Sequence, residues 1–222
     1  MKIFKINQKR IKIFINNFIF FIVFLFVISC EKNKNSNFTI SENLLKFLNN
    51  QNFESNFIAH AAGGIDSDTY TNSIEALEKS IDSGFKLIEI DLMETSDGFF
   101  IGGHHDWPSF KKKLSNIEYQ TDDKAMTLNE VKNSKVYNKY HPLTIDYIND
   151  IFSKNEKLFL VTDKSNNFKK IISDFTFDQN RIIVEIFGRD NYFLSIKEGI
   201  INPMFSATIN DYNFILENNI KL

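Results

Sequence analysis

Residues 85–93 read Phe-Lys-Leu-Ile-Glu-Ile-Asp-Leu-Met and give the clearest indication of the fold. This largely apolar run is followed by the turn signal Asp97-Gly98, so it predicts a buried β-strand. Side chains at positions i and i+2 of a strand point to the same face, which places Glu89 and Asp91 side by side. Such a pair is either a solvated edge of the sheet or, because two ionised carboxylates repel each other, a place where a cation lies between them.

Strand-like and helix-like segments alternate on both sides of this stretch. An apolar run at Phe57–His60 is cut off by Gly63-Gly64, and a helical pattern follows over Asn72–Ser83, where Asn72 and Glu75 resemble a capping box. Strands spaced by helices of about ten residues predict βαβ units and a parallel sheet. The other strand-like runs are residues 99–102, 157–162, 181–187 and 203–208, and the other helix-like runs are residues 127–133, 143–153, 167–174, 191–198 and 211–218.

The fold class that fits this alternation is α/β, either a barrel or a doubly wound sheet. The segment that follows the first strand-like run, His60-Ala-Ala-Gly-Gly, lacks the glycine spacing of a dinucleotide-binding turn, which favours a TIM-type (β/α) barrel. A complete barrel of this type has eight strands and about 250 residues. Residues 57–222 supply only about five to six strands, so we expect a barrel domain that is truncated at its C-terminal end.

Residues that can carry chemistry follow or end several of these strand-like runs. In (β/α) barrels the catalytic groups come from the carboxyl ends of the strands, so these residues are expected to meet at one end of the sheet. Carboxylate oxygens are the ligands that Mg²⁺ and Ca²⁺ prefer. The residues concerned are His60, Glu89, Asp91, the group His104-His105-Asp106, Asp163 and Glu185.

The chain resembles a known family in the segment where these residues are densest. The resemblance lies in His60-Ala-Ala-Gly-Gly, Thr71-Asn-Ser, Glu89-Ile-Asp, Thr95-Ser-Asp-Gly and His105-Asp-Trp. This order of motifs resembles the glycerophosphodiester phosphodiesterases, within the wider group of phosphatidylinositol-specific phospholipase C-like barrels. The resemblance covers roughly residues 57–222.

The resemblance implies a role for most of the residues singled out above. His60 and His105 would act as general acid and base, and Glu89 and Asp91 would bind a divalent metal, Mg²⁺ or Ca²⁺. Asp163 would be a further metal ligand, and Lys164 and Glu185 would contact the substrate.

The chain departs from the family pattern at two positions. An arginine that follows the first histidine in many members is Ala61 here, and the lysine two places after the third-strand acid is Ser165. Lys164 is adjacent, but on a regular strand it would point to the opposite side.

The first thirty residues form a segment of a different kind. Residues 1–29 contain five basic and no acidic side chains, and an apolar run of eleven residues, 18–28, follows the basic part. This run is too short to span a bilayer, which takes about 20 residues, so it predicts a secretory signal. Val27-Ile-Ser-Cys30 resembles a bacterial lipobox, in which Cys30 becomes lipidated. The alternative is an uncleaved membrane anchor with an incidental thiol.

Charge and the single cysteine restrict the remaining possibilities. Without residues 1–29 the chain keeps 21 of its 26 basic residues against 28 acidic ones, and a net charge of −7 disfavours binding to nucleic acid. One cysteine cannot form an internal disulfide. Residues 30–56 are expected to be a tether with a short preliminary helix from Leu44 to Phe53.

The sequence therefore predicts an exported, membrane-anchored lipoprotein of the bacterial cell envelope that hydrolyses phosphodiesters. Its substrates would be glycerophosphodiesters or lipid head groups, with a divalent metal as cofactor. Two alternatives remain open: a catalytically inactive surface lipoprotein that uses the barrel scaffold for binding, and a phospholipase D-like enzyme.

Overall fold

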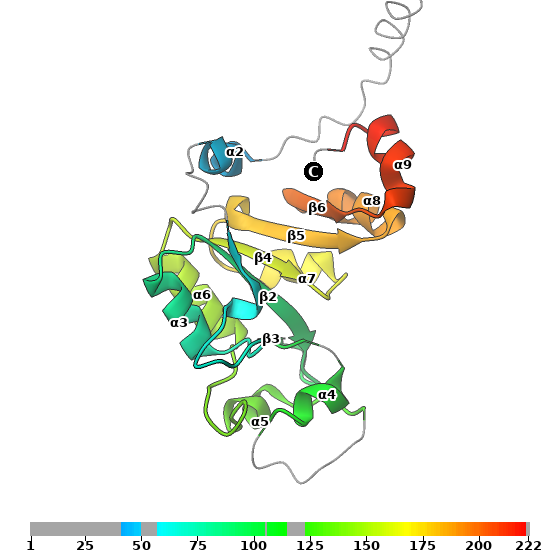
Figure 1. The fold of residues 1–222 in the computed structure, drawn as a ribbon. Coiled ribbons are helices and arrows are strands. Elements are labelled where there is room, and N and C mark those ends of the chain that lie inside the picture. The colour runs from blue at the N-terminus through cyan, green and yellow to red at the C-terminus, as the bar shows by residue number, and fades with distance from the viewer. Residues whose placement is uncertain (1–40, 50–56, 105, 115–122, 221–222) are drawn as a thin grey trace, which may run out of the picture. The chain divides into compact units, whose positions relative to one another are not determined.

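The computed structural model describes residues 41–49, 57–104, 106–114 and 123–220 (Figure 1). The chain divides into two compact units, Met1–Phe38 and Thr39–Leu222, and the first lies outside the described residues. The predicted signal, Cys30 and most of the predicted tether therefore also lie outside them. None of the helices in the described ranges combines the length and the apolar character that crossing a membrane requires.

The second unit is built on a six-stranded sheet. Five strands run parallel in the order β1-β2-β4-β5-β6, and β3 pairs with β2 in the antiparallel direction. The α/β class and the parallel sheet of a (β/α) barrel with about five strands are thus confirmed. The strands are β1 (Ile58–Ala59), β2 (Leu87–Glu94), β3 (Phe100–Gly102), β4 (Phe159–Asp163), β5 (Ile182–Phe187) and β6 (Asn202–Ser206).

β3 corrects one expectation from the sequence. The His104–Asp106 group was expected at the carboxyl end of a barrel strand, but β3 is the return arm of a hairpin with β2. The chain after β3 comes back to the level of Asp91, where the Gly103 N–H donates to the Asp91 carbonyl oxygen at 3.0 Å. The hairpin therefore delivers His104 to the same end of the sheet by a different route.

Helices connect the strands and cover the sheet (Figure 1). α3 and α6 are joined by a hydrogen bond from the Tyr147 hydroxyl to Glu78 Oε1 at 2.6 Å. The helices are α2 (Glu42–Asn49), α3 (Ile74–Asp82), α4 (Trp107–Lys111), α5 (Leu128–Lys132), α6 (Ile145–Lys154), α7 (Phe168–Asp174), α8 (Arg189–Glu198) and α9 (Tyr212–Glu217), with 3₁₀ turns η3 (His60–Ala62), η4 (Gln179–Arg181) and η5 (Ile209–Asp211).

The two faces of the sheet differ because side chains alternate along each strand. One face packs against the helices in the main core, through residues such as Ile88, Ile90 and Leu160. The other face is apolar only near the amino ends of the strands, where Leu44 of α2 packs on a cluster of buried side chains. Towards the carboxyl ends acids follow in all three rows, and the row of β5 then ends in the exposed Phe187. The three rows are Leu87-Glu89-Asp91, Phe159-Val161-Asp163 and Ile183-Glu185-Phe187.

α2 closes the apolar end of this second face. The Phe47 and Phe159 rings lie 4.6 Å apart between centroids, and the Ser41 N–H donates to Asn202 Oδ1 at 3.0 Å. α2 begins at Glu42, two residues before the predicted preliminary helix, and the last part of the predicted range, residues 50–53, lies outside the described residues. Its packing leaves the carboxyl end of the face as the open, polar end.

The connection from β1 to α3 has an unusual backbone. Six non-glycine residues in it have positive φ, a region that L-residues seldom adopt: Ala61, Ala62, Asp66, Ser67, Tyr70 and Asn72. Gly63 is required there, since φ is +98° and a Cβ would lie 2.0 Å from Ser80 Oγ. The helix begins one residue later than the predicted capping box, because Ser73 rather than Asn72 caps α3 by accepting from the Ala76 N–H. Asn72 has a different use, described below.

Candidate functional site

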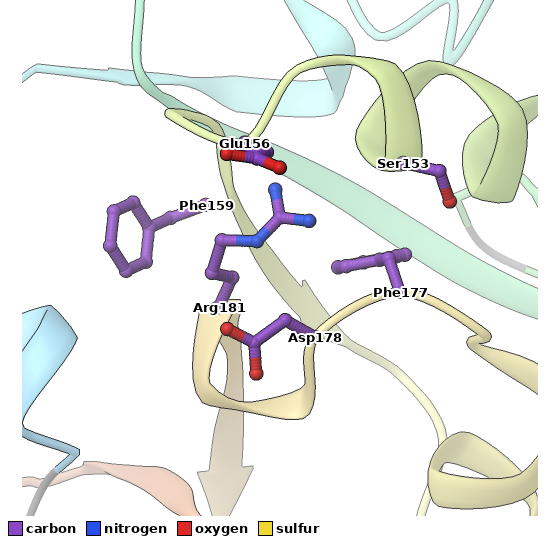
Figure 2. Close-up of a pocket in the computed structure, with 6 residues that line it drawn as sticks. All are labelled: Ser153, Glu156, Phe159, Phe177, Asp178 and Arg181. Carbon is purple, nitrogen blue, oxygen red and sulfur yellow. The ribbon is translucent and has the colours of Figure 1, made fainter.

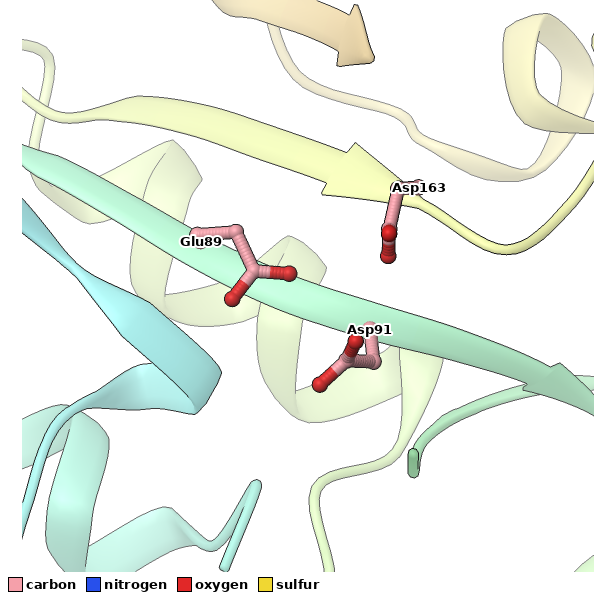
Figure 3. Close-up of side chains that lie close together, drawn as sticks. All are labelled: Glu89, Asp91 and Asp163. Atoms are coloured by element: carbon pink, nitrogen blue, oxygen red, sulfur yellow. The ribbon is translucent and has the colours of Figure 1, made fainter. Parts of the chain in front are cut away.

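Three buried acids form a cluster at the carboxyl ends of β2 and β4. Glu89, Asp91 and Asp163 each offer one oxygen, and these oxygens all lie within 4.8 Å of one another. Asp91 and Asp163 are register partners on adjacent strands, and Glu89 precedes Asp91 by two on the same face. Figure 3 shows Asp163 reaching from β4 towards the pair on β2. The sequence pattern predicted this convergence.

Hydrogen bonds hold two of these carboxylates in place. The Ala61 N–H donates to Glu89 Oε2 at 2.6 Å, and the Asn72 amide donates from Nδ2 to Asp91 Oδ2 at 2.9 Å. Both donors come from the strained connection after β1. The conformation of that connection is therefore tied to the geometry of the acidic cluster.

Burial and mutual repulsion perturb the cluster strongly. Burial raises the pKa of Glu89 to about 8, with further increases from the charges of Asp91 and Asp163 and an opposing effect of the Ala61 N–H. Burial likewise raises the pKa of Asp163 to about 6, against the hydrogen bond from Lys164. The cluster thus resists holding three negative charges by itself.

Lys164 reaches the cluster although a regular strand would turn it away. β4 ends at Asp163, and Lys164 has a φ of +62°, which swings its side chain back. Its Nζ lies 2.6 Å from Asp163 Oδ2 and 3.9 Å from Asp91 Oδ1, and it also lies over the Phe187 ring at 5.5 Å. The expectation that Lys164 points to the opposite side is wrong, because the strand has already ended.

Two imidazoles and one phenol border the cluster. His60 Nε2 lies 3.7 Å from Glu89 Oε2, and His104 Nε2 lies 3.8 Å from Asp91 Oδ1. The Tyr70 ring stands edge-on to both, with centroid distances of 4.9 Å to His60 and 5.7 Å to His104. His105 lies outside the described residues. Within them, His104 is the histidine that the β2–β3 hairpin delivers.

Glu185 lies at the margin of the site rather than in the cluster. It is half-buried on β5, on the same face as Asp163, and its charge contributes to raising the pKa of Asp163. Five of the residues to which the resemblance assigns a role come together: His60, Glu89, Asp91, Asp163 and Lys164. His104 joins them.

The cluster fits a hard divalent cation. Its three carboxylates supply oxygen ligands, and Asp163 Oδ1 is buried with no hydrogen-bond partner among the described residues. A buried polar atom of this kind is uncommon unless an ion or water satisfies it. A cation would also compensate for the burial and the repulsion that together raise the pKa of Glu89. Glu89, Asp91 and Asp163 are therefore the residues that could hold it.

A cavity of about 620 Å³ lies elsewhere, at the amino ends of the strands. Figure 2 shows Arg181 in the middle of its lining, between Phe159 and Phe177. The guanidinium is already bound, because it donates to the carbonyl oxygens of Phe152, Asn155 and Leu158 near the end of α6. Arg181 is therefore a structural residue that satisfies the last carbonyls of a helix.

Sequence reasoning missed three contributions to the site. The Ala61 N–H and the Asn72 amide act through a loop conformation that the sequence did not reveal, and Tyr70 lies in that same loop. One signal was available for Asn72. Asparagine tolerates positive φ better than most residues, so its place in a tight connection was open to a role other than capping.

The geometry places the chain in the class of α/β barrel proteins with an acidic site at the carboxyl ends of the strands. Among solved structures, it resembles a glycerophosphoryl diester phosphodiesterase from Parabacteroides distasonis, with a TM-score of 0.59 and 18% identity over 82% of this chain and 66% of that one. A glycerophosphoryl diester phosphodiesterase domain from Mycobacterium tuberculosis gives a TM-score of 0.54 and 13% identity, over 72% of this chain and 62% of that one.

The chain therefore has the fold of the glycerophosphodiester phosphodiesterases, which confirms the expected resemblance at the level of structure. It spans slightly less than two thirds of the length of these two proteins. By sequence, no family model and no curated protein matches the chain.

Proposed function

We propose that this protein hydrolyses phosphodiesters with the help of a divalent cation, Mg²⁺ or Ca²⁺, held by Glu89, Asp91 and Asp163. The observation that carries the proposal is the convergence of three buried carboxylates beside an exposed imidazole, His60, whose Nε2 lies 3.7 Å from Glu89. The shared fold with enzymes of this activity supports it.

The chemistry follows from the charges at the site. A phosphodiester resists attack because its negative charge repels nucleophiles, and a bound cation would offset that charge. Lys164 adds a positive charge at the same place and can donate a hydrogen bond to a phosphate oxygen. The raised pKa of Glu89 shows that its ionised form is unfavourable without a nearby positive charge.

Proton transfer is assigned to the histidines. The side chain of His60 is 58% exposed, so it can take a proton from an attacking hydroxyl or give one to a leaving alcohol. The partner imidazole comes from the His104-His105 pair. The family resemblance assigns this role to His105, whereas His104 lies 3.8 Å from Asp91.

Two cavities lie next to His60 and Lys164, side chains that border the cluster, although none of the three acids lines either cavity. A cavity of about 540 Å³ is bordered by His60 and Tyr70, and another of about 380 Å³ is bordered by Lys164 and Trp107. We propose glycerophosphodiesters or lipid head groups as substrates, with Glu185 as a margin residue that contacts them. We also propose that the protein is exported and anchored to a membrane of the bacterial cell envelope through Cys30.

A catalytically inactive binding scaffold is the second candidate, and Ala61 favours it. Many family members have an arginine at this position, whereas Ala61 has only a methyl group and is fully buried. The position therefore offers a substrate no cationic side chain. Ser165, where the family has a lysine, removes another. A scaffold of this kind would bind the cation without turning over a phosphodiester.

The test is release of alcohol from glycerophosphocholine and from bis(4-nitrophenyl) phosphate by the full chain. We expect turnover with Mg²⁺ or Ca²⁺ and its loss when EDTA removes the cation. Cation binding by calorimetry without turnover of either substrate would favour the scaffold instead. If neither cation binding nor turnover is observed, the proposed cation site itself is contradicted.

A further inference from the structure

Asn72 is the residue that connects the strained loop to the acidic cluster most directly. Its side chain is almost completely buried, and it makes two hydrogen bonds with Asp91 in opposite directions. Nδ2 donates to Asp91 Oδ2 at 2.9 Å, and Oδ1 accepts from the Asp91 N–H at 3.2 Å. The amide therefore binds both the carboxylate and the backbone of one residue, which leaves Asp91 little freedom to rotate.

These bonds divide the two oxygens of the Asp91 carboxylate between separate tasks. Oδ2 accepts from Asn72, whereas Oδ1 faces His104 Nε2 at 3.8 Å and Lys164 Nζ at 3.9 Å. Oδ1 is thus the oxygen turned towards the groups proposed to act on the substrate. Without Asn72, rotation of the carboxylate would exchange the two oxygens.

The backbone around Asn72 is built to hold this side chain. Its φ is +44°, in the region that asparagine tolerates better than most residues. Its N–H donates to the Ala61 carbonyl at 3.2 Å, and its own carbonyl accepts from the Leu143 N–H at 3.1 Å. The Ala61 N–H in turn donates to Glu89, so one loop holds the two carboxylates that β2 contributes to the cluster.

We propose that Asn72 is a positioning residue that fixes the Asp91 carboxylate and thereby sets the cation affinity of the cluster. The inference rests on the cation site proposed above. Partners that orient a metal ligand typically change metal affinity by roughly 10- to 100-fold when they are removed. The loss should appear in binding itself, before any turnover.

The test is calorimetry with Mg²⁺ or Ca²⁺, whichever binds the unaltered chain, on Asn72→Gly. Glycine removes the amide and accepts the positive φ, so the backbone hydrogen bonds of the loop can persist. We expect Kd to rise by roughly 10- to 100-fold. Because the readout is cation affinity, a loss of stability alone would not produce it.

Asn202 is the matched control. It is equally buried, its Oδ1 accepts from the Ser41 N–H, and its Nδ2 donates to the carbonyls of Asn180 and Ile182 at the opposite end of the sheet. Asn202→Ala should lower the melting temperature while changing Kd by no more than about twofold, as expected of a distant site. A folded Asn72→Gly that binds the cation as tightly as the unaltered chain would overturn the inference.

Two further observations keep the outcomes separate. If the unaltered chain binds neither cation, the proposed function fails; if it binds and Asn72→Gly binds equally, only this inference fails. If Asn72→Gly does not fold, ¹⁵N NMR of the unaltered chain tests the inference instead. The side-chain amide signal of Asn72 should shift during a titration with the cation while that of Asn202 does not, and an unmoved Asn72 signal contradicts the inference.

Discussion

Glu89 combines deep burial with a position two residues from another acid. Its raised pKa, about 8 against an ordinary value of 4.5, means that the cation-free folded protein keeps a proton on Glu89 at pH values where the unfolded chain has lost it. The unfolded state then binds fewer protons, so the contribution of Glu89 to stability falls as pH rises from about 4.5 through 8. A cation that displaces this proton should bind more weakly at low pH.

Glu89→Gln should therefore raise the melting temperature of the cation-free protein at pH 8, and the gain should shrink towards pH 4.5. Each kcal/mol corresponds to about 2–4 °C for a chain of this size. Saturating cation should reverse the order, because it stabilises only the protein that binds it. Scanning calorimetry across this pH range checks both effects, and identical pH profiles for the two proteins would show that Glu89 is not perturbed as described.

His60→Ala should lower turnover by roughly 10²- to 10⁴-fold, the usual contribution of a positioned acid or base. Cation affinity should change little, since His60 lies beside Glu89 rather than in the cluster. His141→Gln is the control, because this exposed histidine pairs with Glu75 away from the cluster. Steady-state kinetics of both variants decides, and equal activities for His60→Ala and the unaltered chain would remove His60 from the mechanism.

Residues within regular strands could be predicted from the sequence, whereas residues in irregular backbone could not. Glu89 and Asp91 were paired because the two-residue period of a strand fixes the face to which each side chain points. Asp163 was placed with them because it ends another strand-like run, and the family resemblance gave it the role of a metal ligand. Lys164 was misplaced because β4 ends at Asp163, and the φ of +62° at Lys164 turns its side chain back towards the cluster. Asn72 was read as part of a helix cap because its bonds to Asp91 depend on a loop conformation that no periodicity encodes.

At the scale of elements, the strand and helix order was predictable because each segment shows its own period and ends at a recognisable turn. One exception is α4, which none of the helix-like runs predicted. Another is β3, whose apolar residues look the same whether the strand pairs parallel or antiparallel. The direction of β3 relative to β2 is decided by the short turn at Asp97-Gly98, which is typical of a hairpin. A stricter reading of that turn would have predicted the hairpin, and with it the route by which His104 reaches Asp91.

The end of α6 supplies a prediction about stability. Arg181→Met should cost roughly 2–4 kcal/mol of unfolding free energy, because it leaves the carbonyls of Phe152, Asn155 and Leu158 without their donor. Cation affinity should be unchanged, since Arg181 lies at the opposite ends of the strands. Urea unfolding measures the first effect and calorimetry the second.

Lys154→Met is the matched control for this helix end. Its exposed pair with Asp150 should contribute only about 0.3–0.5 kcal/mol. If Arg181→Met were no more destabilising than Lys154→Met, the structural role given to Arg181 would be wrong.

For the whole molecule, the fold places every acid of the site at one end of one face, while α2 fills the other end with apolar side chains. This division explains why the large cavity beside Arg181 is not the candidate site. Membrane attachment belongs to this scale too, and it rests on the sequence alone, through the pattern that ends at Cys30.

Cys30→Ser should release the protein from membranes when the full chain is expressed in a bacterium. The unaltered chain should incorporate labelled palmitate and sediment with membranes, because stable anchoring takes two or more acyl chains. Fractionation and labelling of both proteins check this. Equal membrane association of the Cys30→Ser chain, without label in either protein, would favour an uncleaved apolar anchor over a lipid.

The proposed cation site is formed by Glu89, Asp91 and Asp163, which converge to hold one divalent cation beside His60. Anomalous diffraction from crystals grown with Mn²⁺ tests it most directly. We predict a single strong anomalous peak among the three carboxylates, at roughly 2.0–2.6 Å from their oxygens, as is usual for hard cations. A peak elsewhere would contradict this cation site. So would a crystal saturated with Mn²⁺ in which the three carboxylates point away from one another and no peak lies between them.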